Sequence, residues 1–235
     1  MNKESTGICV YNNFGCSDNK FLPLRFMLKL ISFMKKIIVL SVFTLTAFTI
    51  QAQIRYGIKA GANFSTFSGS DAKMGDVSPK YKVGFAGGAL VNVQLSELFS
   101  LQPEVLYSME GASYKEGGES MNYNINYINI PVLAQYNNPS GFYAETGPQL
   151  GLLTSAKMAF DGNSVSMKDN MKKINFSWGF GAGYKLSNGL GIGARYNLGL
   201  TKIDSDEEGE GGETSNIKVG GFHVGLFYTL SAGGK

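Results

Sequence analysis

The chain is poor in the residues on which many enzymes and all helical membrane anchors depend. Its two cysteines, Cys9 and Cys16, both precede Met34, so the chain after that point has no thiol for a disulfide, a nucleophile or a metal site. Any histidine-dependent catalysis would have to use His223, the only histidine. The longest apolar run, Ile37 to Ile50, falls short of the about 20 residues that a spanning helix needs. We therefore expect neither a helical anchor nor, with no cysteine after that run, a lipoprotein.

The first 52 residues are expected to be absent from the mature protein. Met34-Lys35-Lys36 is a charged start, the apolar run follows, and Gln51-Ala52-Gln53 offers a small residue for cleavage. This order is typical of a secretory signal peptide over residues 34–52, cut after Ala52. Residues 1–33 have the character of no domain, and we interpret them as an extension upstream of the true start. A long signal that begins at Met27 is the alternative.

Removal of this segment also removes the positive charge. The whole chain has a formal charge of +3, but the first 52 residues hold six of its 21 Lys and Arg and two of its 18 Asp and Glu, which leaves 15 − 16 = −1. The basic excess therefore does not indicate a nucleic-acid partner. The about 180 residues that remain, 53–235, fit one domain.

The segment from Ile174 to Leu186 alternates in character from residue to residue. Large apolar side chains such as Phe176 and Trp178 occupy one row, and the opposite row holds polar residues and glycine. Successive side chains of a strand point to opposite faces, so each row meets its own environment. The run exceeds a usual strand of about five or six residues but suits a tilted strand that crosses a bilayer. The pattern indicates lipid on one face and a small polar interior on the other.

Seven further segments repeat this alternation, which gives eight candidate strands. They cover residues 55–64, 81–95, 99–109, 128–136, 142–152, 174–186, 190–200 and 222–230.

The connections between these strands alternate strictly in length. Three are tight turns, at 96–97, 137–140 and 187–189, and four are long, at 65–80, 110–123, 157–172 and 202–216. All long connections therefore lie at one end of an antiparallel sheet, as extracellular loops do in outer-membrane barrels. An open sheet edge is not permitted in hydrocarbon. The sequence thus predicts an all-β fold: an eight-stranded antiparallel up-and-down transmembrane β-barrel.

Aromatic residues at the strand ends are expected to form girdles at the membrane interfaces. They include Tyr56, Phe64, Tyr81, Phe99, Tyr107, Tyr136, Phe142, Tyr184 and Tyr228. The competing interpretation is a soluble lipocalin-like barrel, which would place charged residues outside and large apolar ones inside. The outer rows are poor in charge, which argues against it.

From Gln53 to Leu230 the chain resembles the porin-family or OmpX-like outer-membrane β-barrels of Gram-negative bacteria. The last strand carries the most specific motif, because His223, Gly225, Tyr228 and Leu230 fit the polar-x-Gly-x-x-aromatic-x-hydrophobic signal for the outer-membrane assembly machinery. The family usually ends on that hydrophobic residue, whereas this chain continues for a further Ser-Ala-Gly-Gly-Lys. The resemblance implies a monomer in contact with outer-membrane lipids and lipopolysaccharide. It also implies long extracellular loops that meet a host or other surface ligand.

The polar interior is predicted to hold most of the titratable side chains of the strands. These are Arg55, Lys59, Glu104, Glu145, Lys185, Arg195 and His223. Charges in a narrow interior persist only when they are paired, so an ion-paired plug is favoured over a channel that the same residues would line. A lipid-modifying enzyme would need a serine and a carboxylate beside His223 near the outer rim. We expect His223 instead near mid-strand, as a hydrogen-bonding residue of the lumen, and no enzymatic activity.

An acidic segment occupies the fourth long connection. It comprises Asp204, Asp206, Glu207, Glu208, Glu210 and Glu213. Carboxylates could gather Ca²⁺, but their spacing does not match an EF-hand loop. We expect a solvated acidic extracellular loop with at most weak cation binding, and no metal or cofactor site elsewhere.

Overall fold

The computed structural model describes residues 53–117, 119–204 and 215–231. Its elements are β1 (Gln53–Ser68), β2 (Lys80–Gln94), β3 (Phe99–Glu116), β4 (Glu119–Asn137), β5 (Phe142–Phe160), β6 (Asn163–Ser166), the 3₁₀ turn η1 (Lys168–Asn170), β7 (Ile174–Lys185), β8 (Leu190–Gly199) and β9 (Lys218–Ser231).

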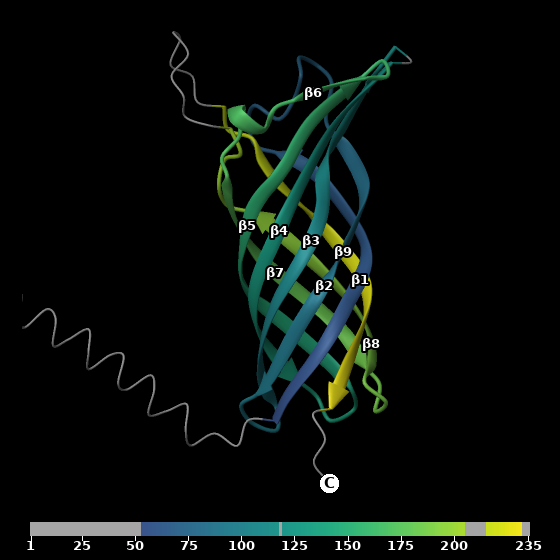
Figure 1. Ribbon diagram of the computed structural model, residues 1–235, viewed down its shortest axis with the longest axis vertical. Helices are drawn as coiled ribbons and strands as arrows, with labels where there is room; N and C mark the ends of the chain where they lie inside the picture. Colours follow the sequence, from purple (N-terminus) through teal and green to yellow (C-terminus); the bar gives the residue numbers. More distant parts are fainter. Residues whose placement is uncertain (1–52, 118, 205–214, 232–235) are drawn as a thin grey trace, which may run out of the picture. The chain divides into compact units, whose positions relative to one another are not determined.

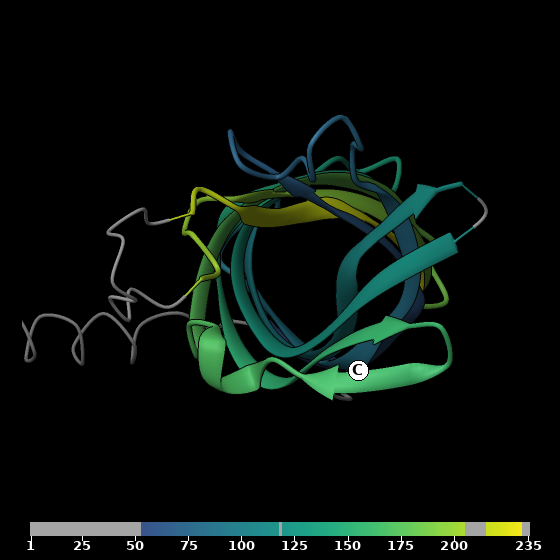
Figure 2. The ribbon, with the colours of Figure 1, turned by 90° about the horizontal axis from the view of Figure 1, so that it is seen from above.

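Eight of these strands form a closed antiparallel ring. The order is β4-β3-β2-β1-β9-β8-β7-β5, and β5 pairs with β4 to close it (Figure 2). Short β6 lies outside the ring, because it pairs only with the last four residues of β5 (Figure 1). The predicted eight-stranded up-and-down barrel is confirmed.

No helix within the described residues has the length and apolar character to cross a membrane.

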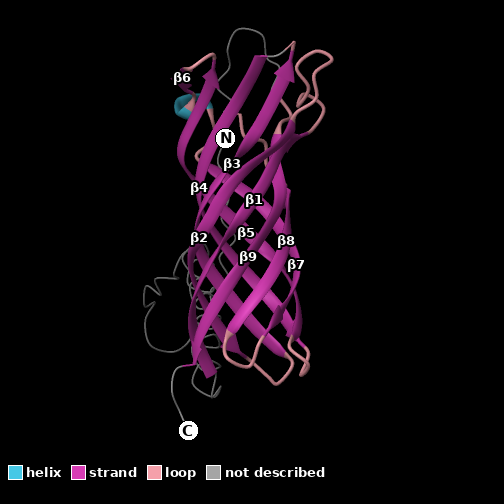
Figure 3. Ribbon diagram, turned by 90° about the vertical axis from the view of Figure 1, so that its right-hand side faces the viewer, coloured by secondary structure: helices cyan, strands magenta, loops and turns pink. Residues whose placement is uncertain are grey.

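The barrel has two unlike ends, visible in Figure 3. We call the end with the connections 95–98, 138–141 and 186–189 the turn end, and the opposite end the loop end. Over the part nearer the turn end, the interior is mostly polar and large apolar side chains cover the outside. On β7, for example, Phe176 and Phe180 are exposed while Asn175 and Ser177 are buried. This arrangement is the inverse of a soluble barrel.

Aromatic pairs ring the outer surface near both ends of this apolar zone. Toward the turn end, Phe99 packs against Tyr136 with ring centroids 5.5 Å apart, and Phe142 packs against Tyr184 at 4.8 Å. Toward the loop end, Phe222 contacts both Tyr81 and Tyr196, with ring centroids 6.4 and 4.8 Å apart. These positions suit interfacial girdles.

Two segments expected to be loops contain strand. The prediction of a loop over residues 110–123 is wrong, because β3 and β4 continue as a paired hairpin up to Glu116 and Glu119. Part of 157–172 belongs to β5, β6 and η1. The chain was expected to leave the sheet where the apolar-outside pattern stops, whereas the strands continue past that point with the pattern reversed.

Strand β4 shows the reversal most clearly. Its outward row is asparagine from Asn122 to Asn126 and then apolar from Ile128 to Val132. Its inward row is aromatic or aliphatic from Tyr123 to Tyr127, and polar at Asn129. The two faces therefore exchange character between residues 126 and 128 with no break in the strand. Beyond this point the outer face of the strand is polar, and the inner face contributes to a conventional apolar core.

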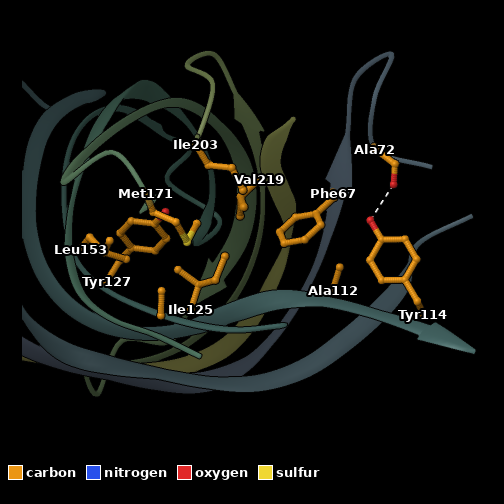
Figure 4. Packing of buried hydrophobic residues seen from close by; sticks show 11 residues of the cluster. Phe67, Ala72, Ala112, Tyr114, Ile125, Tyr127, Leu153, Met171, Ile203 and Val219 are labelled. Atoms are coloured by element: carbon orange, nitrogen blue, oxygen red, sulfur yellow. Dashed lines mark hydrogen bonds between the residues drawn. The ribbon is translucent and has the colours of Figure 1, made fainter. Parts of the chain in front are cut away.

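That core closes the loop end of the lumen. Its buried members are Phe67, Ala72, Ala112, Tyr114, Ile125, Tyr127, Leu153, Ala156, Met171, Ile203 and Val219 (Figure 4). They come from strands around the ring and from the connections above it. The hydroxyl of Tyr114 donates a hydrogen bond of 2.6 Å to the carbonyl oxygen of Ala72, which ties the first long connection to the outer end of β3.

The first and last long connections are also tied to each other. The backbone N–H of Asn216 donates to a carboxylate oxygen of Asp71 at 2.7 Å, and this bond holds the pKa of Asp71 below its usual value. The tie joins two connections at the loop end that lie far apart in sequence.

Candidate functional site

Four charged side chains from four strands meet in the lumen, and we call them the ion cluster: Lys59, Glu104, Glu145 and Arg195. The guanidinium of Arg195 donates Nη1 and Nη2 to the two oxygens of Glu104 at 2.9 and 2.8 Å. Its Nε donates to Glu145 Oε1 at 2.8 Å. Lys59 Nζ lies 3.5 Å from Glu104 Oε1. All four are buried, and their two positive and two negative charges balance.

The inward rows of the strands explain how these residues meet. Each member occupies an inward position, and glycine opposite the long side chains leaves the room they need. Gly181 of β7 lies beside both Glu145 and Arg195 in the ladder. A Cβ at Gly181 would stand 2.9 Å from the backbone carbonyl oxygen of Ala194 and 2.8 Å from Glu145 Oε1, so the backbone and the Glu145 carboxylate would have to shift. The small residues of the inner face thus leave the space that the side chains of the ion cluster occupy.

Buried amides give the carboxylates of the ion cluster further hydrogen-bond donors. Gln102 Nε2 donates to Glu104 Oε1 at 2.8 Å, and Gln135 Nε2 donates to Glu145 Oε2 at 2.8 Å. The side-chain amide of Asn92 donates to the Oε1 atoms of both Gln102 and Gln135. Both carboxylates therefore have several donors, which is what charges need to remain ionised away from water. The arrangement is chemically a plug of paired charges.

The other three residues expected in the lumen lie apart from the ion cluster. His223 is buried on β9 beside Arg195 in the ladder, but neither ring nitrogen has a partner with hydrogen-bond geometry among the described residues. Its ring lies near the backbone of Ala86, and its role as a hydrogen-bonding residue of the lumen stays a prediction. Arg55 and Lys185 lie at the turn end, where they line a cavity of about 800 Å³.

Sequence reasoning missed one buried carboxylate. Glu110, placed at the start of a loop, is a buried lumen residue that accepts a 2.7 Å hydrogen bond from Asn129 Nδ2. The signal was present, because the inward row of β3 runs without interruption from Gln102 through Ser108 to Glu110. The apolar seal above it was also missed, for the same reason: its residues were assigned to loops.

Along its axis the lumen is filled at several levels. The turn-end cavity is followed by the packed side chains of Leu90, Tyr143 and Phe227, and then by the ion cluster. A polar void of about 10 Å³ beside Glu110 comes next, and the apolar core closes the loop end.

The remaining candidates fall on the last strand and the acidic segment. His223 and Gly225 occupy the inward row of β9, whereas Tyr228 and Leu230 face outward, on the strand that closes the ring against β1. Asp204 forms an isolated backbone bridge with Met171. The other acidic residues, Asp206, Glu207, Glu208, Glu210 and Glu213, lie outside the described residues, as do the extension and the signal segment.

A closed barrel with an apolar outer belt and a polar interior is a transmembrane β-barrel, since hydrocarbon requires every backbone polar group to be paired internally. Residues 50–205 match the family model described as outer membrane protein beta-barrel domain, and the chain belongs to this family. It is an outer-membrane protein. By the rule for such barrels, the turn end faces the periplasm and the loop end the exterior.

Three solved structures illustrate the similarity. Neisserial surface protein A is 15% identical with a TM-score of 0.48, over 74% of this chain and 97% of that one. The attachment invasion locus protein Ail of Yersinia pestis, in complex with the heparin analogue sucrose octasulfate, is 16% identical with a TM-score of 0.43, over 76% and 99%. OprG from Pseudomonas aeruginosa is 12% identical with a TM-score of 0.38, over 78% and 99%. No curated protein matches the chain.

Proposed function

We propose that this protein is a closed, non-enzymatic surface protein of the outer membrane, in which the barrel is the anchor and the structure above the membrane is the interacting part. The observation that carries the proposal is the filling of the lumen at two separate levels, by the ion cluster and by the apolar core. A solute would have to displace both. The alternative is a narrow porin for small polar solutes, for which the periplasmic cavity would be the inner vestibule.

The extracellular part of the sheet supports a binding role. The outer ends of β3, β4 and β5, together with β6, form one paired sheet above the membrane. It presents exposed apolar side chains at Phe160 and Val165, with Met74 of the first connection nearby at the same end. Because these side chains stand on paired strands, little free energy would be lost in ordering this surface when a partner binds. The ligand we infer is a host or other surface molecule with an apolar contact area.

Conductance separates the two functions. The purified protein is reconstituted in planar bilayers, and a closed barrel should leave the membrane at its baseline current. Stable, large conductance steps that scale with the amount of inserted protein would refute the closed-barrel proposal and favour the porin. An Arg195→Ala variant is the informative companion, since loss of the guanidinium should raise leak if the ion cluster is a barrier.

Attachment tests the surface role. Cells that display the wild-type protein are compared with cells that display a Phe160→Ser, Val165→Ser variant on immobilised matrix proteins. We expect the variant to attach less, with unchanged heat-modifiable migration on gels as the control for folding. Lys157→Ser, a polar change on the same strand, should attach as the wild type does. Equal attachment by all three, above that of cells without the protein, would refute a role for this sheet.

The absence of enzymatic activity is part of the same proposal. His223 lies deep in the lumen rather than at the rim, and among the described residues no serine or carboxylate hydrogen-bonds to its ring. A comparison of outer-membrane lipids from cells with and without the protein should show the same species. A new lipid or lipopolysaccharide product would refute this point.

The remaining partners follow from the family. We infer that the protein inserts as a monomer through the outer-membrane assembly machinery, recognised by the motif at His223, Gly225, Tyr228 and Leu230, and that lipopolysaccharide and outer-membrane lipids surround it. Deletion of the described end of β9 from Tyr228 onward should abolish insertion. Normal insertion without these residues would contradict the assignment of the motif.

A further inference from the structure

The small polar void in the lumen lies between the ion cluster and the apolar core. Its volume is about 10 Å³, which is about the space that one water molecule needs. The residues that line it come from β1, β3, β5, β7, β8 and β9, so side chains from most of the ring face one small space. The lining contains one carboxylate, that of Glu110, and no lysine, arginine or histidine.

Glu110 differs from the other buried carboxylates in the described part of the chain. Glu104 and Glu145 both accept hydrogen bonds from Arg195, whereas Glu110 makes no ion pair with any described residue. Its donors are Asn129 Nδ2, at 2.7 Å, and the hydroxyl of Ser108, and both are neutral. A buried carboxylate without a compensating charge is costly. The ion cluster is balanced within itself, so it has no surplus positive charge to offer Glu110.

Two further oxygens at the void have no partner. Ser177 is 3% exposed, and neither its Oγ nor Asn197 Oδ1 has a hydrogen-bond partner among the described residues. Ser177 lines the void from β7 and Asn197 lines it from the neighbouring β8. Buried polar groups of native proteins are nearly always satisfied. One group placed in the void can satisfy both oxygens and the Glu110 carboxylate together.

The chemistry of the lining selects that group. A water molecule can donate to these oxygens, but it leaves the charge of Glu110 uncompensated. Carboxylate, hydroxyl and amide oxygens are the ligands that hard cations prefer. A divalent ion would exceed the single negative charge, and Mg²⁺ also keeps several waters for which the void has no room. A dehydrated alkali ion of the size of Na⁺ carries the one charge that is needed and is smaller than a water molecule.

We propose that the void is a binding site for one alkali metal ion of the size of Na⁺, held by the carboxylate of Glu110 and the side-chain oxygens of Ser177 and Asn197. The ion joins β3, β7 and β8 across the lumen and completes its charge balance. Sequence reasoning predicted no metal site, and it also placed Glu110 in a loop. The site does not depend on the proposed surface role, because that role belongs to the outer ends of β3, β4 and β5 with β6. Either proposal can therefore fail without the other.

The test is the dependence of folding on the identity of the alkali ion. The whole protein is unfolded by urea in phosphatidylcholine vesicles at neutral pH, and the fluorescence of Trp178, the only tryptophan, is followed. Ionic strength is held constant while Na⁺ or Cs⁺ replaces N-methylglucamine. A ligand that binds only the folded state stabilises it as its concentration rises, so a tenfold rise in Na⁺ should increase the ratio of folded to unfolded protein by about three- to tenfold. The same rise in Cs⁺, which is too large for the void, should leave this ratio unchanged.

Variants locate the effect at the void. Glu110→Gln keeps the shape of the side chain and an acceptor for Asn129 but removes the charge, so it should lose the response to Na⁺. Ser177→Ala removes one oxygen of the site and should weaken the response. The matched control is Glu97→Gln, which removes an exposed carboxylate at a turn and should respond as the wild type does. Heat-modifiable migration verifies that each variant is folded before it is measured.

Three results would overturn the proposal. Equal unfolding of the wild type in Na⁺, Cs⁺ and N-methylglucamine means that Glu110 is protonated or meets only water. A response to Na⁺ that persists in Glu110→Gln, or that is also lost in Glu97→Gln, means that the ion does not bind at the void. A larger effect of Ca²⁺ than of Na⁺ at equal ionic strength refutes the assignment to an alkali ion.

Discussion

Loss of the guanidinium of Arg195 should be the most costly single change in the lumen. In the Arg195→Met variant three charge-assisted hydrogen bonds disappear, and the ion cluster changes from neutral to a net charge of −1. Removal of one partner from a buried ion pair typically costs about 3–5 kcal/mol, because the remaining charge stays uncompensated. At about 1.4 kcal/mol per factor of ten, the ratio of folded to unfolded protein should fall by about two to three and a half powers of ten.

The second variant separates charge balance from simple loss of contacts. Arg195→Met combined with Glu104→Gln removes one charge of each sign and leaves Lys59 with Glu145, a neutral remainder. Because a buried pair replaced as a whole is often nearly neutral in stability, the double variant should be more stable than the single one. The two substitutions should therefore be strongly non-additive.

Urea unfolding in lipid vesicles measures both variants. Trp178 is the only tryptophan and lies on the lipid-facing row, so its fluorescence reports the loss of the barrel. Lys157→Met, an exposed change, should stay within about 0.5 kcal/mol of the wild type. A cost below about 1 kcal/mol for Arg195→Met, or a double variant less stable than the single one, would refute the description of the lumen as a plug of balanced charges.

Three further changes test the loop end and the membrane boundary. Val132→Lys places a cation on the lipid-facing row of β4 and should lower the free energy of unfolding by about 2–4 kcal/mol in the same assay. Asn122→Lys lies on the same row above the boundary and should lower it by almost nothing. Equal losses would contradict the exchange of faces. Tyr114→Phe loses its bond to the first connection, at about 0.5–1.5 kcal/mol, and should quicken protease cleavage of that connection on whole cells. Asp71 has a lowered pKa in the folded protein, so its hold on the Asn216 amide is complete above its unfolded pKa and is lost as pH falls through the folded one. The protection of that amide, measured as its exchange rate relative to the intrinsic rate at each pH, should fall there. Asp71→Asn should remove this pH dependence of the protection.

The strand pattern from Ile174 to Leu186 was sufficient to predict β7 and its lipid-facing row, because alternation depends only on local geometry. The extension of β4 above the membrane was not predicted, since a row of asparagines outside and aromatics inside reverses the pattern used to find strands. The partners of Arg195 were beyond sequence reasoning for another reason. Glu145 and Glu104 lie 50 and 91 positions away, and which inward residues share a level depends on the stagger of the closed ring.

The exchange of faces on β4 also sets the thickness of the membrane that the protein fits. Its outward apolar row runs from Ile128 to Tyr136, about nine residues. With a rise of about 3.3 Å per residue and a tilt of about 40°, this row spans about 23 Å along the membrane normal. A typical bilayer has a hydrocarbon core of about 30 Å, and the bacterial outer membrane is thinner than average. Hydrophobic matching would therefore penalise the folded barrel in the thicker membrane that the chain crosses on export, and favour it in the one where it resides.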